Sequence, residues 1–424
     1  MKIIEGFEPL KSILSRQGPS SGFETDEREK TVRSIITEVS RRGDAALYEY
    51  TRRFDGVTLD SLEVSKDQVT AASNSVGPEL LSALDLAAER ISSYHNAQRD
   101  SLLNESVREG LGWLIRPLKR VGIITPGFTS PLPSSLLMAA VPAKVAGVNE
   151  IILATPPQKN GSVHPATLAA AKIAGVDRIF SVGGAQAVAA LAYGTESIPA
   201  VDKIFGPGNI YVTLAKKLLY GVVGVDGLFG PSEVVIIADD GANPAYCASD
   251  LLAQAEHTSG SAIMLTSSQK IAHKVRSEVG EQLKGLNNRK ETEKNLEDRG
   301  MIGFVESINE AIELANLYAP EHLLLLVENA GYYLEKVTAA GCVIIGKKGT
   351  VALGDYIAGP AHILPTGGTA RFSSPLNVTD FVKITSLIDT DKIDIDEIGN
   401  AAQIIAKTEG LDAHAKAIEK RLGG

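Results

Sequence analysis

The sequence predicts an α/β protein in which two α/β units follow one another along the chain. From residue 121 onward, short apolar runs alternate with alanine-rich stretches of helical length, and the alternation resumes after residue 234. This order is typical of βαβ units, in which helices cover both faces of a mostly parallel sheet. A chain of 424 residues has room for about two or three domains.

The apolar runs are the predicted strands, and the stretches between them are the predicted helices. In the first unit, strands are expected at 121–125, 150–154, 178–182 and 202–205, with helices at 134–146, 164–174, 185–193 and 212–220. In the second unit, strands are expected at 234–238, 261–265, 323–327 and 342–345.

Helical segments flank this α/β region. Residues 1–18 form an arm with an apolar stripe that needs a cover, such as a second subunit. Longer helices are expected at 24–42 and 78–99, and a last helix at 407–421 carries His414.

The composition excludes several classes of protein. The 42 basic and 51 acidic residues give a net charge of −9 without a basic cluster, which argues against a nucleic-acid partner. Two cysteines, Cys247 and Cys342, outside any CxxC pair argue against a disulfide framework and fit a reducing compartment. No uncharged apolar run approaches the roughly 18 residues of a membrane span, so we expect a soluble, cytoplasmic protein.

A possible half of a metal site lies in the segment after residue 243. Asn243 and Pro244 predict a helix start, because Asn is a favoured cap and Pro fits the first turn. Gln254 and His257, three residues apart, then project to one side near the end of this helix. Such a pair could supply two metal ligands, although the commoner role of a histidine there is to cap the free carbonyls of the helix.

Two glycine-containing turns follow predicted strands and open predicted helices, at Gly183-Gly184 and at Gly206-Pro-Gly-Asn209. Small residues let the backbone approach a pyrophosphate, and the helix N-terminus offers free N–H groups. Either turn alone could be an ordinary connection, but two neighbouring turns favour a dinucleotide crevice. The sequence does not reveal the acidic residue that would bind a ribose.

Two further segments carry titratable groups. Glu321 and His322 stand where a buried strand is expected to begin, and burial there could shift the pKa of each toward neutrality. The Gly- and Pro-rich loop 354–368 carries Asp355 and His362, and loops of this length are often binding loops. Simpler interpretations stay open, namely a solvated loop for the Glu-His pair and an exposed surface position for His414.

Together these segments resemble the histidinol dehydrogenase family over nearly the full length of the chain. The matching segments are Pro-Ala-Lys-Val-Ala-Gly-Val from residue 142, Gly-Gly-Ala-Gln-Ala from 183, Gly-Pro-Gly-Asn from 206, Gly-Pro-Ser-Glu-Val from 230, Asp-Leu-Leu-Ala-Gln-Ala-Glu-His from 250, Ala-Pro-Glu-His-Leu from 319, Gly-Asp-Tyr from 354, His-Ile-Leu-Pro-Thr-Gly-Gly-Thr-Ala-Arg-Phe-Ser-Ser-Pro from 362 and Leu-Asp-Ala-His from 411.

The resemblance implies a set of site residues. It implies one zinc ion per subunit, with Gln254, His257, Asp355 and His414 as ligands. It implies Glu321 and His322 as catalytic residues, His322 for the alcohol proton and Glu321 for activating water. Implied substrate contacts are Ser232, Gln254, His257, His322, Asp355, Glu409 and His414, and implied NAD contacts are Gln186 and Asn209.

The implied fold is two tandem, incomplete Rossmann-like domains with small N- and C-terminal helical segments, in a domain-swapped homodimer. The expected boundaries are an N-terminal arm (1–21), a first α/β domain with the metal and catalytic residues (22–122 with 234–376), a second α/β domain for NAD (123–233) and a helical dimerisation segment (377–424). Glu409 and His414 would act in trans, across the dimer.

The implied reaction is the oxidation of L-histidinol through L-histidinal to L-histidine by two NAD in turn, in histidine biosynthesis. This chain has Ile124 and Phe128 where the family commonly has Tyr and Gly, differences that bear on NAD binding. Two other functions stay open. One is a zinc- and NAD-dependent dehydrogenase of another small polar alcohol, such as a sulfonated diol, which Glu409 would repel. The other is a zinc hydrolase, in which Glu321 activates water and no nucleotide binds.

Overall fold

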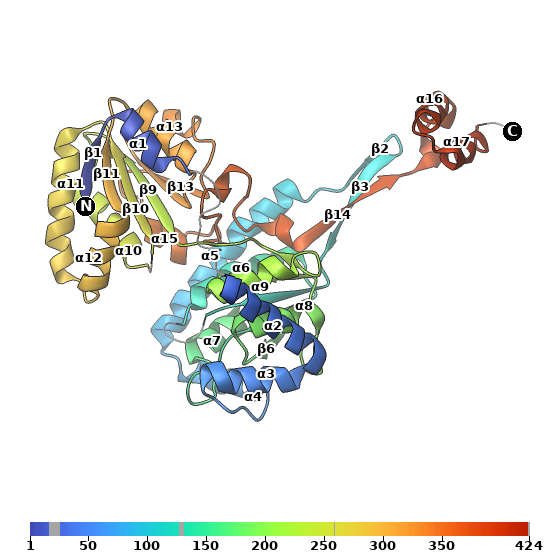
Figure 1. Cartoon of the computed structure of the whole chain (residues 1–424), viewed down its shortest axis with the longest axis horizontal. Helices are drawn as coiled ribbons and strands as arrows, with labels where there is room; N and C mark the ends of the chain where they lie inside the picture. Colours follow the sequence, from blue (N-terminus) through green and yellow to red (C-terminus); the bar gives the residue numbers. More distant parts are fainter. Residues whose placement is uncertain (17–25, 127–130, 258, 423–424) are drawn as a thin grey trace.

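The computed structural model describes residues 1–16, 26–126, 131–257 and 259–422, arranged as two α/β bodies and a projecting arm (Figure 1). We call residues 1–16 with 233–356 body A, residues 26–102 with 120–225 body B, and residues 106–117 with 382–422 the arm. Residues 357–381 cross from body A to body B, where their apolar side chains, among them Ile363 and Phe381, join the core.

Body A is built on a six-stranded parallel sheet with the order β1-β11-β10-β9-β12-β13. Its strands are β1 (Lys2–Glu5), β9 (Glu233–Ala238), β10 (Ser261–Thr266), β11 (Gly300–Phe304), β12 (His322–Leu326) and β13 (Cys342–Ile345). One face is covered by α10 (Pro244–Ala255), α11 (Gln269–Gln282) and α12 (Arg289–Arg299), and the other by α1 (Phe7–Leu14) and α13 (Ile308–Tyr318). Two short helices, α14 (Ala330–Leu334) and α15 (Val351–Tyr356), follow β12 and β13.

Body B has a five-stranded parallel sheet with the order β6-β5-β4-β7-β8. Its strands are β4 (Arg120–Ile124), β5 (Glu150–Ala154), β6 (Arg178–Phe180), β7 (Lys203–Phe205) and β8 (Gly224–Val225). The connecting helices are α6 (Pro133–Ala146), α7 (Pro165–Ile173), α8 (Gly184–Tyr193) and α9 (Ile210–Leu219). The alternation predicted for residues 121–220 is therefore confirmed, and each predicted strand of the second unit is present in body A.

Both sheets share one topology. In body B, β5 pairs beside β4 and β6 pairs beside β5, so the first three strands follow one another toward one edge of the sheet. The next strand, β7, then pairs with β4 on its other side. Body A repeats this order with β9, β10 and β11, then β12 on the other side of β9, and adds β1 at one edge. This is the doubly wound order of Rossmann-like folds with one strand fewer, so the predicted incomplete Rossmann-like architecture agrees with the strand order.

The helices of residues 26–102 belong to body B, so the predicted grouping of residues 22–122 with 234–376 is wrong for them. These helices are α2 (Asp26–Arg42), α3 (Asp44–Tyr50), α4 (Lys66–Ser75) and α5 (Pro78–Leu102). Helix α2 packs on α8 and α9, α4 packs on α7, and α5 packs on α6. An amphipathic pattern shows that a helix covers something, but it does not show which of two sheets it covers.

The N-terminal segment is also part of a sheet, contrary to the expectation of a free arm. Strand β1 pairs in parallel with β11, and α1 buries Leu10 and Leu14 against body A. The apolar stripe does need a cover, as predicted, but the cover comes from the same chain and not from the second subunit suggested for it. Strands β1 and β11 are not predicted from the sequence, because each is short and flanked by charged residues.

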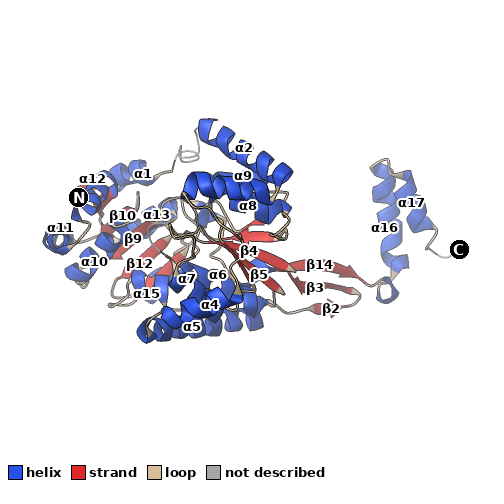
Figure 2. Ribbon diagram, turned by 90° about the horizontal axis from the view of Figure 1, so that it is seen from below, coloured by secondary structure: helices blue, strands red, loops and turns tan. Residues whose placement is uncertain are grey.

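The arm is a three-stranded antiparallel ribbon that ends in two helices (Figure 2). Its elements are β2 (Ser106–Arg108), β3 (Leu111–Pro117), β14 (Val382–Ile388), α16 (Ile395–Thr408) and α17 (Asp412–Glu419). The C-terminal segment is therefore only partly helical. The single helix predicted at 407–421 is interrupted at Gly410, whose φ of 74° ends α16.

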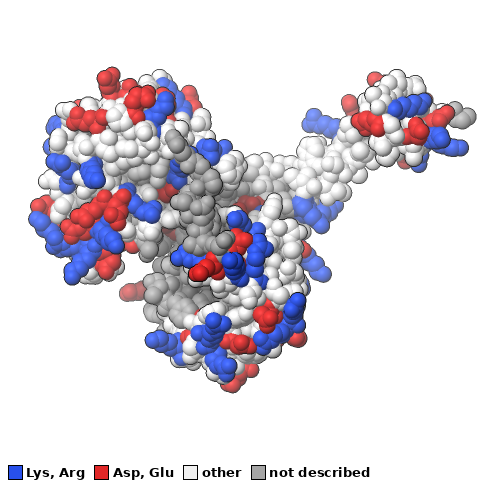
Figure 3. Space-filling model, in the orientation of Figure 1, with Lys and Arg blue, Asp and Glu red and all other residues white. Residues whose placement is uncertain are grey.

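The surface carries mixed charge. Figure 3 shows Lys and Arg interspersed with Asp and Glu over both bodies, while much of the arm between the bodies and the terminal helices α16 and α17 is uncharged. Among the described residues, no helix is both long enough and apolar enough to cross a membrane.

Replacing Leu10 with Ala tests the docking of the N-terminal segment on body A. Leu10 is 0% exposed, and removing its side chain leaves a cavity, so we expect the free energy of unfolding to fall by about 2–5 kcal/mol. Ile13→Ala is the matched control on the same helix, because Ile13 is 55% exposed and should matter little. Urea unfolding followed by circular dichroism compares the two, and similar losses for both variants would contradict the packing described.

Candidate active site and nucleotide pocket

A cluster of titratable side chains lies at the amino ends of two neighbouring strands in body A. Ser232 precedes β9, Glu321 precedes β12, and His322 is the first residue of β12. Because β9 and β12 are parallel, with His322 opposite Val234, the three side chains are brought to one edge of the sheet.

Glu321 is held in place by two donors. Its Oε2 accepts hydrogen bonds from the Ser232 hydroxyl and from the Glu233 backbone N–H at 2.9 Å. Burial of the carboxyl group raises the pKa of Glu321, and the neighbouring His322 and Ser232 oppose this rise. The result is a carboxylate with an elevated pKa and a fixed orientation.

His322 lies between two carboxylates. Its Nε2 is 3.3 Å from Asp355 Oδ1, and its Nδ1 is 3.8 Å from Glu321 Oε2. Burial alone would lower the pKa of this imidazole, but Asp355 and Glu321 favour the protonated ring and raise the pKa above its ordinary value. Ser232, Glu321, His322 and Asp355 thus form one continuous series of contacts.

His362 connects this series to body B. Its Nδ1 is 2.6 Å from the backbone carbonyl oxygen of Asp355, and its Nε2 is 3.0 Å from the hydroxyl of Ser135 on α6. A carbonyl oxygen only accepts, so Nδ1 carries the proton and Nε2 accepts from Ser135. Burial lowers the pKa of His362, which agrees with this neutral form. The sequence analysis singled out His362, but nothing in the sequence pointed to Ser135.

A cavity adjoins the cluster. Its volume is 370 Å³, and His322, Cys342, Gly354 and His362 are among the residues that line it. This is enough room for a small polar substrate beside the imidazole of His322.

Gln254 and His257 lie at the C-terminal end of α10, near the amino ends of the strands, where the cluster also lies. Gln254 is 3% exposed, and its Nε2 is buried without a hydrogen-bond partner among the described residues. His257 lies just beyond the last residue of the helix and is exposed. Its charge is among the influences that lower the pKa of His362, so it faces the same region.

Glu409 and His414 lie far from this cluster within one chain. Both are exposed and belong to the two helices at the end of the arm (Figures 1 and 2). Within the described ranges, no three His, Cys, Asp or Glu side chains are close enough to hold a metal ion. Within one chain, Glu409 and His414 therefore lie apart from the cluster around His322.

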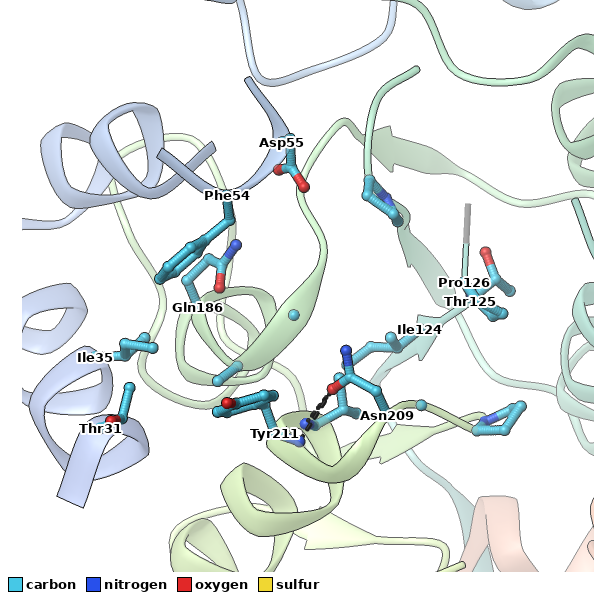
Figure 4. A pocket seen from close by; sticks show the side chains of 16 residues that line it. Thr31, Ile35, Phe54, Asp55, Ile124, Thr125, Pro126, Gln186, Asn209 and Tyr211 are labelled. Atoms are coloured by element: carbon cyan, nitrogen blue, oxygen red, sulfur yellow. Dashed lines mark hydrogen bonds between the residues drawn. The ribbon is translucent and has the colours of Figure 1, made fainter. Parts of the chain in front are cut away.

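A second candidate site lies at the carboxyl ends of the strands of body B and has a volume of 560 Å³ (Figure 4). We call it the nucleotide pocket, after the dinucleotide crevice that the sequence predicts. Its described lining residues are Thr31, Ile35, Phe54, Asp55, Ile124, Thr125, Pro126, Pro156, Gly184, Ala185, Gln186, Pro207, Gly208, Asn209, Tyr211 and Val212. It opens where the strand order reverses between β4 and β7, which is where doubly wound sheets bind nucleotides. Ile124 lies on its wall, whereas Phe128 lies outside the described residues.

Asn209 and Gln186, the two residues implied for NAD, both line this pocket. The Asn209 side chain caps α9 by accepting hydrogen bonds from the backbone N–H groups of Tyr211 at 3.0 Å and Val212 at 3.2 Å. Gln186 is buried in the first turn of α8. Each predicted glycine turn therefore opens a helix whose N-terminus faces the pocket.

A buried ion pair fixes the turn at Gly206. Asp226 accepts a hydrogen bond from the Gly206 N–H at 2.7 Å and pairs with Lys216 Nζ at 2.7 Å, while Lys216 also donates to the Gly206 carbonyl. Both charged side chains are 2% exposed. Gly206 has a φ of 105°, and a Cβ there would lie 2.1 Å from the Ile124 carbonyl oxygen. The sequence could not reveal this pair, because nothing distinguishes Lys216 from its neighbour Lys217.

The comparison with known proteins gives one consistent result. Residues 19–422 match the sequence profile of the histidinol dehydrogenase family. A histidinol dehydrogenase of Dehalococcoides mccartyi (strain CBDB1) is 51% identical, with 100% of both chains covered. The chain belongs to the histidinol dehydrogenase family.

Other members of this family agree with that assignment. A histidinol dehydrogenase of Deinococcus radiodurans is 47% identical over 97% of this chain and 94% of its own. The crystal structure of histidinol dehydrogenase from Elizabethkingia anophelis has a TM-score of 0.92 at 36% identity, with 100% of this chain and 98% of that chain covered. Membership of the histidinol dehydrogenase family makes this chain an oxidoreductase.

Neither cysteine of this family member is set up as a nucleophile. Burial raises the pKa of Cys247 to about 12, and burial also raises the pKa of Cys342. The thiolate, which is the nucleophilic form, is therefore disfavoured at both positions.

Replacing Lys216 with Met tests the clamp on the Gly206 turn. Removing one partner leaves Asp226 charged and buried, so we expect the free energy of unfolding to fall by about 3–5 kcal/mol. Lys217→Met is the matched control, because Lys217 is exposed on the same helix and should change stability little. Thermal unfolding of the two variants and of the unchanged protein, followed under the same conditions, measures the two losses of stability. A Lys216 variant as stable as the Lys217 variant would show that the pair does not hold the turn.

Proposed function

We propose that this chain oxidises L-histidinol through L-histidinal to L-histidine in histidine biosynthesis, with NAD as the hydride acceptor. The observation that carries the proposal is the contact series from Ser232 through Glu321 and His322 to Asp355, found in a member of this family. An imidazole and a carboxylate at one site suit a reaction that removes a proton first from an alcohol and then from water.

His322 is the base for the alcohol. It takes the hydroxyl proton as the C–H hydride leaves, and the flanking carboxylates of Glu321 and Asp355 stabilise the imidazolium that forms. A raised pKa makes the ring a stronger base for this step.

Glu321 is the base for water. Both donors that orient it, the Ser232 hydroxyl and the Glu233 N–H, bind Oε2, so Oε1 is the oxygen that accepts the proton of water as it attacks the aldehyde. The hydrate then loses a second hydride. Two hydrides and three protons leave per histidinol, and water supplies the second carboxylate oxygen.

NAD would occupy the nucleotide pocket of body B against Gln186 and Asn209, and when bound it would accept each hydride. The N-terminus of α8, which has no side-chain cap, would face its pyrophosphate with free N–H groups. Through His362, which also bonds the Asp355 carbonyl, the Ser135–His362 hydrogen bond joins body B, which carries this pocket, to helix α15 in body A.

One zinc ion per subunit would be held by Gln254, His257, Asp355 and His414. Nitrogen and oxygen ligand atoms of this kind suit zinc, and the Gln254 side chain is buried at this place. When bound, the ion would orient the substrate through its imidazole and amino nitrogens. Ser232 would contact the substrate from the other side of the cluster.

A second copy of the chain would complete the site, in a domain-swapped homodimer. The arm carries large exposed apolar side chains, among them Ile388 on β14 and Ile398, Ile404 and Ile405 on α16, and a surface of this kind is typical of a subunit interface. The partner would cover it and contribute Glu409 and His414, with Glu409 facing the cationic imidazole of the substrate. Such an enzyme would work in the cytoplasm.

Counting NADH tests the function and the two roles. L-Histidinol should yield about two NADH per molecule and L-histidinal about one. His322→Gln should slow alcohol oxidation by about 10²–10⁴-fold, whereas Glu321→Gln should slow aldehyde oxidation by a similar factor and alcohol oxidation less. Equal losses for Glu321→Gln in both half-reactions would remove the role assigned to Glu321.

Glu328→Gln is the matched control, because Glu328 is exposed at the opposite end of β12. Its two half-reactions should match those of the unchanged protein. A chelator should lower the rate of the unchanged protein, and added zinc should restore it. Hydrolysis without NADH formation would point to a zinc hydrolase instead.

Co-expression of two inactive variants tests the shared site. A heterodimer of His322→Gln and His414→Ala chains has one site with both defects and one with neither, if His414 acts across the interface. With random pairing, we expect about a quarter of the normal activity, whereas each variant alone should be nearly inactive. No recovery in isolated heterodimers would place His414 in the site of its own chain.

A further inference from the structure

The nucleotide pocket contains one charged side chain that the proposed mechanism does not use. Of the described residues that line it, Asp55 is the only one with a charge, and neither Lys nor Arg is among them. The turn that carries Asp55 lies more than a hundred residues before the glycine turns in the sequence, so no local motif connects it to them.

Asp55 is firmly positioned. It ends a π-helical turn, Thr51–Asp55, directly after α3. The ring of Phe54 stacks on that of Tyr50, with centroids 5.5 Å apart, and Tyr50 is anchored in the core of body B. These contacts hold Asp55 at the rim of the pocket without help from any ligand.

The carboxylate of Asp55 lacks a described partner. Its Oδ2 is buried and accepts no hydrogen bond from the described part of the chain, and burial raises the pKa of Asp55 to about 6. A buried acceptor without a donor is costly, and a ligand that supplies donors relieves this cost.

The position of Asp55 indicates which part of a dinucleotide it meets. Figure 4 shows Asp55 and Phe54 on the side of the pocket away from Thr125 and Pro126. Thr125 and Pro126 follow β4 and precede α6, the helix whose Ser135 hydrogen-bonds His362 in the catalytic region. The reactive end of the dinucleotide therefore belongs on the Pro126 side, and the adenosine end belongs beside Asp55.

We propose that Asp55 binds the hydroxyl groups of the adenosine ribose and makes the pocket select a dinucleotide with a free 2′-hydroxyl over its 2′-phosphorylated form. This inference rests on the proposed use of the pocket for NAD. A ribose diol donates two hydrogen bonds to a carboxylate, whereas a 2′-phosphate brings negative charge toward it. No described Lys or Arg on the pocket wall would compensate that charge.

Binding to the unchanged protein gives the first test. Isothermal titration calorimetry with ADP-ribose and with 2′-phospho-ADP-ribose should show at least about tenfold tighter binding of ADP-ribose. Equal affinities would overturn the inference. Failure of the unchanged protein to bind ADP-ribose at all would overturn the proposed use of the pocket as well.

Asp55→Asn gives the second test, because it removes the charge and keeps the shape. The ratio of kcat/KM for NAD to kcat/KM for NADP should fall by about tenfold or more. Asp60→Asn is the matched control, because Asp60 is exposed nearby, and it should keep the normal ratio. An unchanged ratio in Asp55→Asn, alongside normal binding of ADP-ribose by the parent protein, would refute the role of Asp55 alone.

Discussion

The constraint on which the site depends is the reversal of strand order that occurs once in each sheet. Where the chain passes from the third strand back across the first, neighbouring connections run apart and leave a crevice. Body B has its pocket at this point, at the carboxyl ends of β4 and β7. Body A has the cluster of Ser232, Glu321 and His322 at the corresponding pair, β9 and β12, but at the amino ends. The same topology therefore serves two purposes at opposite ends of its strands.

The two sites lie at opposite ends of their strands, and the direction of the helices explains which residues reach the site in body A. Helices in βαβ units run antiparallel to their strands, so the C-terminal end of α10 lies near the amino ends of the sheet and brings Gln254 and His257 there. The crossing segment 357–381 then carries His362 from body A to Ser135 of body B. The hydrogen bonds from Ser135 to His362 and from His362 to the Asp355 carbonyl can therefore align two sites that lie in different bodies.

Buried charges in this protein differ in how they are satisfied. Lys216 and Asp226 satisfy each other and the backbone around Gly206, so their burial serves structure. The imidazole of His322 contacts the carboxylates of Glu321 and Asp355 but leaves its Nδ1 without a hydrogen-bond partner among the described residues. The pKa values of Glu321 and His322 are both raised. Asp55 has no described partner for one of its oxygens. Incomplete satisfaction of a buried charge costs stability, and it is most readily explained where a ligand or reaction intermediate completes it.

The sequence by itself determined the α/β class, most strands of both sheets, the two glycine turns and the residues around Glu321, because periodicity, caps and turn chemistry are local properties. It also supplied the family, through many short segments in a fixed order. Only the tertiary structure decided that helices 26–102 cover body B, that residues 1–16 complete body A, and that Ser135 and Asp55 stand beside residues far away in the chain. These facts depend on which surfaces meet, and an amphipathic pattern specifies that a face is buried without specifying its partner.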